Sequence, residues 1–261
     1  MPANAMAPAA PPAEVSFMWP FRTRSEPLRL EARPACRSYG KGARRVQMFA
    51  LGAAAAGLAL ASAVAEPVGT GRPVKIVALG DSLTAGLGLP ADATFPVRLQ
   101  QALAQKGVAT EVVNAGVSGD TTADGLSRLD WSVPDDTDAV IVELGANDAL
   151  RGLDPGQARA NLDAILKRLA ACKLPVLLAG MRAPPNLGAD YTKAFDAIYP
   201  DLAAAYGALL YPFFLDGVAA DRSLNQGDGL HPTAAGVDVI VAKILPQVEE
   251  LVARARAHAA H

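Results

Sequence analysis

The segment VKIVALGDSLTAG, from Val74 to Gly86, sets the framework for interpreting the rest of the chain. Its first six residues are mostly apolar, which is typical of a β-strand buried on both faces of a parallel sheet. Asp81 and Ser82 follow at once, after Gly80. A serine in this position either caps a short helix or serves as a nucleophile at the end of a sheet.

Short apolar segments and amphipathic helices alternate from this strand to the end of the chain. The predicted strands are Val74–Leu79, Thr110–Asn114, Ala139–Leu144, Val176–Ala179 and Leu209–Tyr211. The predicted helices are Pro96–Lys106, Thr121–Leu129, Pro155–Ala171, Tyr191–Tyr206 and Pro232–Ala257, the last with a kink at Pro246. Such alternation favours right-handed crossovers with helices on both faces of one sheet. We therefore expect an α/β fold, a three-layer α/β/α sandwich around a mainly parallel five-stranded sheet.

The composition divides the chain near residue 65. Residues 1–65 hold eight Lys or Arg and three Asp or Glu, which leaves 16 basic and 23 acidic residues in 66–261. This acidic excess argues against a nucleic-acid partner, because phosphate backbones attract basic surfaces. Residues 1–40 are rich in Ala, Pro and Arg, which indicates a disordered extension or a start codon assigned too early. We expect a single domain over residues 66–261.

Residues 41–65 have the order of features that is typical of a secretory signal peptide. A basic patch precedes an apolar run of 14 residues, Met48 to Ala61, and Ala63-Val64-Ala65 forms a small-x-small cleavage site. An N-terminal membrane anchor is the alternative, but a spanning helix needs roughly 20 apolar residues. We expect cleavage near Ala65 and a periplasmic or secreted protein.

Polar loops that contain glycine follow four of the predicted elements. They are Gly80-Asp81-Ser82, NAGVSGDTT (114–122), LGANDALRG (144–152) and GDGLHP (227–232). Ligands of open α/β sheets bind at the carboxyl ends of the strands. The four loops are therefore expected to share one rim.

A serine nucleophile needs a base, and the base needs a group that orients it. His231 is the candidate base, because His258 and His261 lie in the C-terminal tail. Asp228 stands three residues earlier, a spacing that lets its carboxylate reach the imidazole. The structural alternatives are that Ser82 caps a helix and that His231 is bound only by backbone.

Two other motifs are excluded by their context. The nucleophile elbow G-x-S-x-G is absent, because Leu83 and Thr84 follow Ser82. The glycines at 86 and 88 resemble a dinucleotide fingerprint, but no strand directly precedes them and Pro90 stands where a helix should begin. We expect no nucleotide and no other cofactor.

Two further functions stay open at this point. A metal-dependent phosphoesterase could gather several ligands on one rim, namely Asp81, Asn147, Asp148, Asp228 and His231. A single histidine is few for a dinuclear centre, so we expect no metal. A non-catalytic binding protein on the same fold is the second alternative, because fold does not imply function.

The blocks GDSLTAG, NAGVSGDTT, ELGANDALRG and DGLHP resemble, in sequence and order, those of the GDSL/SGNH hydrolase superfamily. The likeness extends over most of residues 73–250 and is greatest to the periplasmic thioesterase I/lysophospholipase and arylesterase branch. The resemblance implies a flavodoxin-like SGNH fold. It also implies a serine esterase that cleaves acyl or aryl esters or thioesters through an acyl-enzyme intermediate.

The resemblance also assigns roles to residues. It implies that Ser82 is the nucleophile, His231 the base and Asp228 the acid of the triad. The oxyanion hole would consist of the N–H groups of Ser82 and Gly119 and the side-chain amide of Asn147. Glycine suits a backbone N–H that points into a site, and an amide donates without carrying charge. The alternative for Asn147 is an Asx-turn, and Asp81 is expected to be structural.

Apolar residues of the loops 147–152 and 180–191 are expected to line the acyl side of the site. They are Leu150, Met181, Pro184, Pro185, Leu187 and Tyr191, with plain loop packing as the alternative. Arg151 or Arg182 would meet a phosphate head group, or be a solvated surface charge. The expected partner is a small acyl or aryl ester, with transient contact to membrane lipid, and the protein is expected to be a monomer.

Overall fold

The computed structural model of the chain describes residues 72–259. The predicted extension over residues 1–40 and the predicted signal peptide over residues 41–65 lie outside this range. Strands and helices alternate along the described residues, as the sequence predicts. No helix between residues 72 and 259 is both long enough and apolar enough to cross a membrane.

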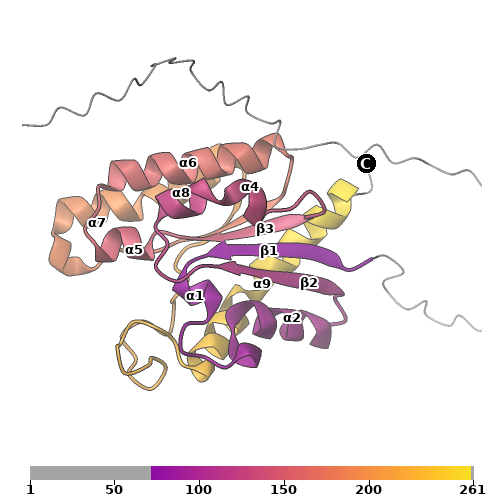
Figure 1. The fold of residues 1–261 in the computed structure, drawn as a ribbon, viewed down its shortest axis with the longest axis horizontal. Coiled ribbons are helices and arrows are strands. Elements are labelled where there is room, and N and C mark those ends of the chain that lie inside the picture. The colour runs from indigo at the N-terminus through magenta and orange to yellow at the C-terminus, as the bar shows by residue number, and fades with distance from the viewer. Residues whose placement is uncertain (1–71, 260–261) are drawn as a thin grey trace, which may run out of the picture. The chain divides into compact units, whose positions relative to one another are not determined.

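Five strands form one parallel sheet in the order β2-β1-β3-β4-β5, which confirms the predicted three-layer fold (Figure 1). The strands are β1 (Val74–Gly80), β2 (Thr110–Gly116), β3 (Ala139–Glu143), β4 (Val176–Ala179) and β5 (Leu209–Tyr211). Gly80 lies opposite Gly116 in one ladder and opposite Glu143 in the other. The strands β1, β2 and β3 therefore end level with one another, and the connections reverse direction between β1 and β3. This edge is where ligands bind in open parallel sheets.

Helices cover both faces of the sheet. α2 (Phe95–Gln105) packs against α9 (Ala234–Ala259) on one face, and α6 (Pro155–Ala171) packs against α8 (Ile198–Tyr206) on the other (Figure 1). The strands between them are buried on both sides, and their apolar side chains have no exposed surface, as at Ile76, Val77, Val140, Ile141, Leu177 and Leu178. Burial of each such side chain contributes roughly 1.5–3 kcal/mol, and this core holds the strand ends in place.

The predicted helix over Tyr191–Tyr206 is two helices in the structure, which corrects the prediction. α7 (Ala189–Asp196) ends and α8 begins after a single residue. Pro200 lies in the first turn of α8, where its missing N–H leaves nothing to donate to the carbonyl of Asp196. Its ring also crowds that carbonyl, which favours a break between the two helices.

The predicted helix over Thr121–Leu129 is also divided. α3 (Thr122–Ser127) is followed by α4 (Leu129–Ser132), and Arg128 stands between them. The hydroxyl of Thr121 accepts from the N–H of Asp124, whose carboxylate accepts in turn from the N–H of Thr121. This capping box fixes where α3 begins.

The C-terminal helix begins two residues later than predicted, at Ala234. The hydroxyl of Thr233 accepts from the N–H of Gly236 at 3.3 Å, as a residue that caps a helix does. The helix continues through Pro246 to Ala259. Short helices in the loops were not predicted, namely α1 (Ser82–Ala85), η1 (Ala91–Ala93), α5 (Ala146–Leu150) and η2 (Pro185–Leu187).

Candidate active site

Ser82 lies at the junction of β1 and α1, and 8% of its surface is exposed. Asp81 caps α1, because its Oδ1 accepts from the N–H of Leu83 at 2.9 Å. Gly86 ends the helix with φ of 83°, a conformation that glycine adopts without strain. Strand and helix thus meet in a tight turn that presents the hydroxyl of Ser82 at the carboxyl edge of the sheet.

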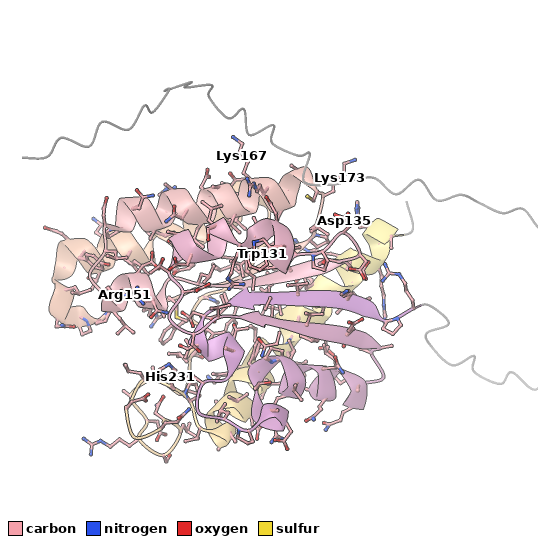
Figure 2. All side chains as sticks on the ribbon, in the orientation of Figure 1. Trp131, Asp135, Arg151, Lys167, Lys173 and His231 are labelled. Atoms are coloured by element: carbon pink, nitrogen blue, oxygen red, sulfur yellow. The ribbon has the colours of Figure 1, made fainter. Side chains whose placement is uncertain are left out.

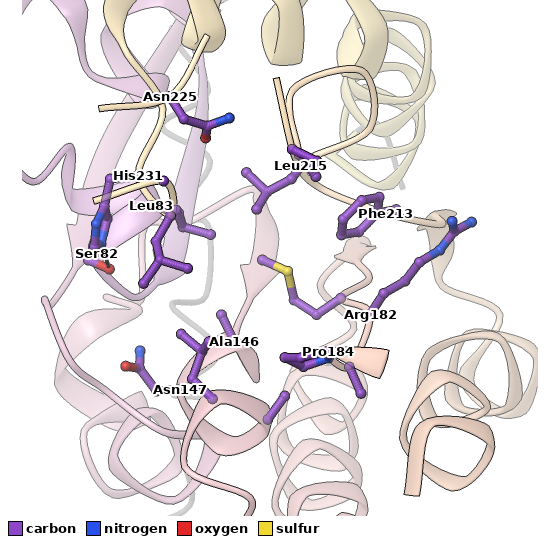
Figure 3. Close-up of a pocket in the computed structure, with 18 of the residues that line it drawn as sticks. Ser82, Leu83, Ala146, Asn147, Arg182, Pro184, Phe213, Leu215, Asn225 and His231 are labelled. Atoms are coloured by element: carbon purple, nitrogen blue, oxygen red, sulfur yellow. Dashed lines mark hydrogen bonds between the residues drawn. The ribbon is translucent and has the colours of Figure 1, made fainter. Parts of the chain in front are cut away.

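The structure brings Ser82, His231 and Asp228 together, as predicted. Ser82 Oγ lies 2.9 Å from His231 Nε2, and His231 Nδ1 lies 2.6 Å from Asp228 Oδ2. A proton on Nδ1 can be donated to the carboxylate, which leaves Nε2 free to accept from the hydroxyl. Figure 3 shows the imidazole beside the serine at one end of a pocket. A hydroxyl, a base and a carboxylate in this order can carry out nucleophilic catalysis.

Asp228 binds both the side chain and the backbone of the histidine loop. Its Oδ1 accepts from the N–H of His231 at 3.0 Å and from that of Leu230 at 2.9 Å. These two backbone bonds, with the imidazole bond, lower the pKa of Asp228 to about 2. The carboxylate therefore stays ionised near neutral pH, and it holds the imidazole in one orientation.

Gln226 fixes the histidine loop to the rest of the site. Its N–H donates to the carbonyl of His231 at 2.7 Å. Its side-chain amide donates to the carbonyls of Leu87, at 2.8 Å, and Pro232, at 2.9 Å. The segment that carries the base is thereby tied to the segment that follows the serine, a link that the sequence pattern did not indicate.

Two residues that line the site, Ser82 and Gly119, have backbone N–H groups without an internal partner. Gly119 has φ of 89°, which favours glycine, and it lies between β2 and α3. Within residues 72–259, neither its N–H nor that of Ser82 is paired with an acceptor. Arg151 Nη2 donates to the carbonyl of Gly119 at 2.7 Å and so holds this peptide in place. Figure 2 shows Arg151 and His231 near the same edge of the sheet.

The side-chain amide of Asn147 is already bound on the protein side. Its Nδ2 lies 3.0 Å from the carbonyl oxygen of Asp120 and 3.2 Å from Asp81 Oδ2. These partners lie far away in sequence, so the contacts are not those of a local Asx-turn. A primary amide has two hydrogens. To donate to a substrate, Asn147 would have to give up the longer of these bonds.

Two buried carboxyl groups, Asp81 and Glu143, lie behind the serine. Burial raises the pKa of Asp81 to about 6, against the bonds from Leu83 and Asn147. Burial, and then the charge of Asp81, raise the pKa of Glu143 well above its usual value. Thr84 donates its hydroxyl to Glu143 Oε2 at 2.7 Å. Two such carboxyls cannot both be ionised cheaply, so this pair opposes a second negative charge behind the serine.

The carboxylates that a metal centre would need are directed into the protein. Asp148 is 2% exposed and accepts from the N–H of Thr122 at 2.8 Å and from its hydroxyl at 2.6 Å. Asp81 is buried behind the serine. In the part of the chain that the structure describes, no three His, Cys, Asp or Glu side chains are grouped to hold a metal ion.

An apolar cavity of about 510 Å³ extends from Ser82 and His231 (Figure 3). Arg182, whose guanidinium lies 5.1 Å from the centre of the Phe213 ring, also lines it. Among the side chains predicted to line the acyl side, Leu150, Met181, Pro184 and Pro185 do so. Further lining residues that were not predicted are Leu83, Leu87, Ala146, Leu215 and Leu230.

Leu187 and Tyr191 do not belong to the lining of this cavity. The hydroxyl of Tyr191 donates to the carbonyl of Leu153 at 2.7 Å, and its ring stacks on Phe195 with the centroids 6.1 Å apart. These contacts hold the tyrosine against the helices. Tyr191 therefore packs on Phe195 and the segment of Leu153 and does not line the cavity.

Comparison with known proteins places the chain among hydrolases. The model of the GDSL-like lipase/acylhydrolase family matches residues 78–239. Arylesterase of Vibrio mimicus is 40% identical over 159 residues, which is 60% of this chain and 80% of that protein. Thioesterase 1/protease 1/lysophospholipase L1 of Escherichia coli K12 is 39% identical over 178 residues, 68% of this chain and 84% of that protein.

A solved structure agrees with these matches. The crystal structure of AlinE4, described as an SGNH-hydrolase family esterase, is 50% identical in sequence. It covers 70% of this chain and 98% of its own, with a TM-score of 0.60.

Proposed function

The chain belongs to the GDSL-like lipase/acylhydrolase family, and we propose that it hydrolyses acyl or aryl esters or thioesters through a covalent acyl-enzyme. One observation carries this proposal. Ser82 Oγ lies 2.9 Å from His231 Nε2 at the end of an apolar cavity. A nucleophile in contact with its base, beside a space that accepts an acyl chain, is the arrangement that ester hydrolysis requires.

In the first half of the reaction, Ser82 Oγ attacks the carbonyl carbon and His231 Nε2 takes the hydroxyl proton. Asp228 stabilises the imidazolium that forms, through its bond to Nδ1. The tetrahedral intermediate then collapses, and His231 gives the proton to the leaving oxygen or sulfur. In the second half, a water molecule attacks the acyl-serine by the same steps, which releases the acid and regenerates the hydroxyl.

The negative charge that develops on the carbonyl oxygen requires donors. We assign this role to the N–H of Ser82, the N–H of Gly119 and the amide of Asn147. The two backbone groups are supported by their lack of acceptors within residues 72–259. Asn147 would exchange its 3.2 Å bond to Asp81 for one to the oxyanion, which is a stronger acceptor as its charge grows.

The proposed substrates are acyl or aryl compounds of moderate size. A cavity of about 510 Å³ is in the range of pockets for small ligands, and Leu150, Met181 and Pro184 give it apolar walls. The names of the relatives, an arylesterase and a thioesterase/lysophospholipase, support the same range. Leu87, Leu150 and Leu230 also line the cavity yet are about half exposed, which supports transient contact with membrane lipid.

We also propose that the protein acts as a monomer in the periplasm or outside the cell. The support is the signal-peptide pattern of residues 41–65, with cleavage near Ala65. After expression in a bacterium, the protein should be recovered from the periplasm with Glu66 near its N-terminus. Recovery from the cytoplasm with residues 1–65 attached would reject this proposal.

The test of the reaction uses p-nitrophenyl esters, acyl-CoAs and lysophospholipids as substrates for the purified protein. We expect turnover of at least one class, unchanged by EDTA, and labelling of Ser82 by a fluorophosphonate. Ser118 and Ser127 serve as internal controls, and Ser82→Ala should abolish both labelling and turnover. An adduct on either control serine, no adduct at all, or loss of activity on chelation would each contradict the proposal.

A further inference from the structure

Arg128 stands between α3 and α4, and its side chain makes several polar contacts close to the candidate active site. Its side chain is 12% exposed. Nε donates to Asp120 Oδ2 at 2.6 Å, and Nη2 donates to the carbonyl of Gly80 at 2.8 Å. Nη1 donates to the carbonyl of Ala115 at 2.9 Å and to the hydroxyl of Ser132 at 3.0 Å. One guanidinium therefore binds four groups from three separate segments.

Two of these groups adjoin the proposed oxyanion donors. Gly80 ends β1, two residues before Ser82, and Asp120 directly follows Gly119. The carbonyl of Asp120 also accepts from Asn147 Nδ2 at 3.0 Å. The proposed N–H donors, Ser82 and Gly119, thus each lie within two residues of a residue that Arg128 binds. The third proposed donor, the amide of Asn147, is hydrogen-bonded to one of these residues, Asp120.

We propose that Arg128 is a positioning residue that sets the spacing of the oxyanion hole. It does not line the substrate cavity, so it acts through Gly80 and Asp120. The inference rests on the proposed function, because it needs the N–H groups of Ser82 and Gly119 and the amide of Asn147 to stabilise the oxyanion.

The geometry of the guanidinium suits this task. Its donors lie in a rigid planar fork, so a single side chain can hold acceptors that lie in different directions at fixed distances. The ammonium of a lysine is a point charge on a flexible stem and cannot reach the strand-end carbonyls and Asp120 together. Arg128→Lys therefore keeps the positive charge beside Asp120 and removes the fixed spacing.

The experiment compares Arg128→Lys with Arg168→Lys in the full chain. Arg168 forms a similar ion pair, 3.0 Å from Asp130, but both side chains are about half exposed. We measure kcat and KM for a p-nitrophenyl ester, and the inhibition constant of a trifluoromethyl ketone that adds to the serine and forms an oxyanion. Fluorophosphonate titration gives the concentration of competent sites, so misfolded molecules do not contribute to kcat.

Arg128→Lys should lower kcat about 10- to 100-fold, less than the roughly 100- to 1,000-fold loss on removing a donor outright. The affinity for the ketone should fall by a similar factor, while KM stays within about threefold, because the bound ester depends little on the oxyanion donors. Arg168→Lys should change none of these quantities. A purely structural role for Arg128 would lower the unfolding midpoint and leave kcat per titrated site unchanged.

The proposal is overturned if Arg128→Lys keeps kcat per site and ketone affinity within twofold of the unmodified protein. If Arg128→Lys yields no titratable sites, Asp120→Asn decides, because it weakens the anchor of the guanidinium and keeps both strand-end carbonyls. A selective loss of kcat and ketone affinity in Asp120→Asn supports the proposal, and unchanged values overturn it. Failure of the proposed function is recognised separately, because Ser82 would then not be labelled even in the unmodified protein.

Discussion

Replacement of Asn147 by alanine separates its proposed catalytic role from its contacts inside the protein. The triad does not depend on this side chain, since Ser82, His231 and Asp228 contact one another directly. Loss of one oxyanion donor typically lowers kcat by about 100- to 1,000-fold, or about 2.7–4 kcal/mol. KM should change little, because the ground-state carbonyl depends less on that donor.

The structure also limits how much stability this substitution costs. Asn147 donates to Asp81 Oδ2, so the variant leaves a buried carboxylate with one bond fewer. The pKa of Asp81 is about 6, and it rises further when the amide that lowers it is lost. Asp81 can then take up a proton near neutral pH, which limits the cost of this lost bond to roughly 1 kcal/mol, since one pKa unit corresponds to about that free energy. The bond to the carbonyl of Asp120 is lost as well, so the expected loss of unfolding free energy is roughly 1–3 kcal/mol.

The assay measures kcat and KM on a p-nitrophenyl ester, with sites counted by fluorophosphonate titration, and unfolding in urea. Asn161→Ala is the matched control. Asn161 is buried and donates to the hydroxyl of Thr122 at 3.0 Å, but it does not line the cavity. We expect the control to lose stability and keep kcat, and Asn147→Ala to lose kcat by the larger factor.

Two results would refute the reasoning about Asn147. The first is near-normal kcat per titrated site, which would make Asn147 a structural residue that holds Asp81 and Asp120. The second is a loss of kcat that Asn161→Ala shows to the same extent, which would trace the effect to loss of packing. If Asn147 is an oxyanion donor, labelling of Ser82 in Asn147→Ala should slow but persist, because the nucleophile and its base remain.

Three further variants test the triad, the buried acids and the cavity. Asp228→Asn should lower kcat by up to about 10,000-fold by favouring the wrong tautomer of His231, with little change in stability; a kcat within tenfold would contradict this. Glu143→Gln should match the unmodified protein in urea at pH 5 and exceed it at pH 9. Because the pKa of Glu143 is raised, the folded state binds the proton of this carboxyl more tightly than the unfolded state does. The stability that this proton contributes is lost as pH rises through the raised pKa, whereas glutamine does not ionise and loses none. Met181→Trp should fill part of the cavity and raise KM for octanoyl esters more than for acetyl esters; equal changes would place the acyl chain elsewhere.

The fold follows from the sequence where apolar runs are short and clearly bounded. β4, β5 and α6 have the predicted limits, because polar residues, glycine or proline flank their apolar segments. β1 and β2 extend further than predicted, through Gly80 and Gly116, since a glycine adds no apolar signal to a strand. The break before α8 was visible in the sequence as Pro200, and the break at Arg128 was not, because arginine is a good helix former.

The candidate catalytic residues could be located from the sequence because each stands in a loop at the carboxyl edge of the sheet. The supporting residues could not, because their roles depend on contacts between segments far apart in sequence. Gln226 reaches Leu87 across 139 positions, and Arg128 reaches Gly80 across 48. Among these supporting residues, Glu143 could have been noticed in the sequence, because it is an acidic residue that ends an otherwise apolar strand. Such a position indicates a buried carboxyl group with a shifted pKa.

The charges of the carboxyl groups behind Ser82 connect these supporting residues to the proposed reaction. The oxyanion is negative, so any carboxylate near it opposes the transition state. Arg128 compensates Asp120 at 2.6 Å, and Asp81 is held by two donors. Glu143 has a hydroxyl donor at Oε2, from Thr84, while its Oε1 has no partner within the described residues, and burial raises its pKa. A raised pKa favours the neutral form of this carboxyl, so Glu143→Gln should leave the charge behind the serine, and hence kcat at pH 7, nearly unchanged.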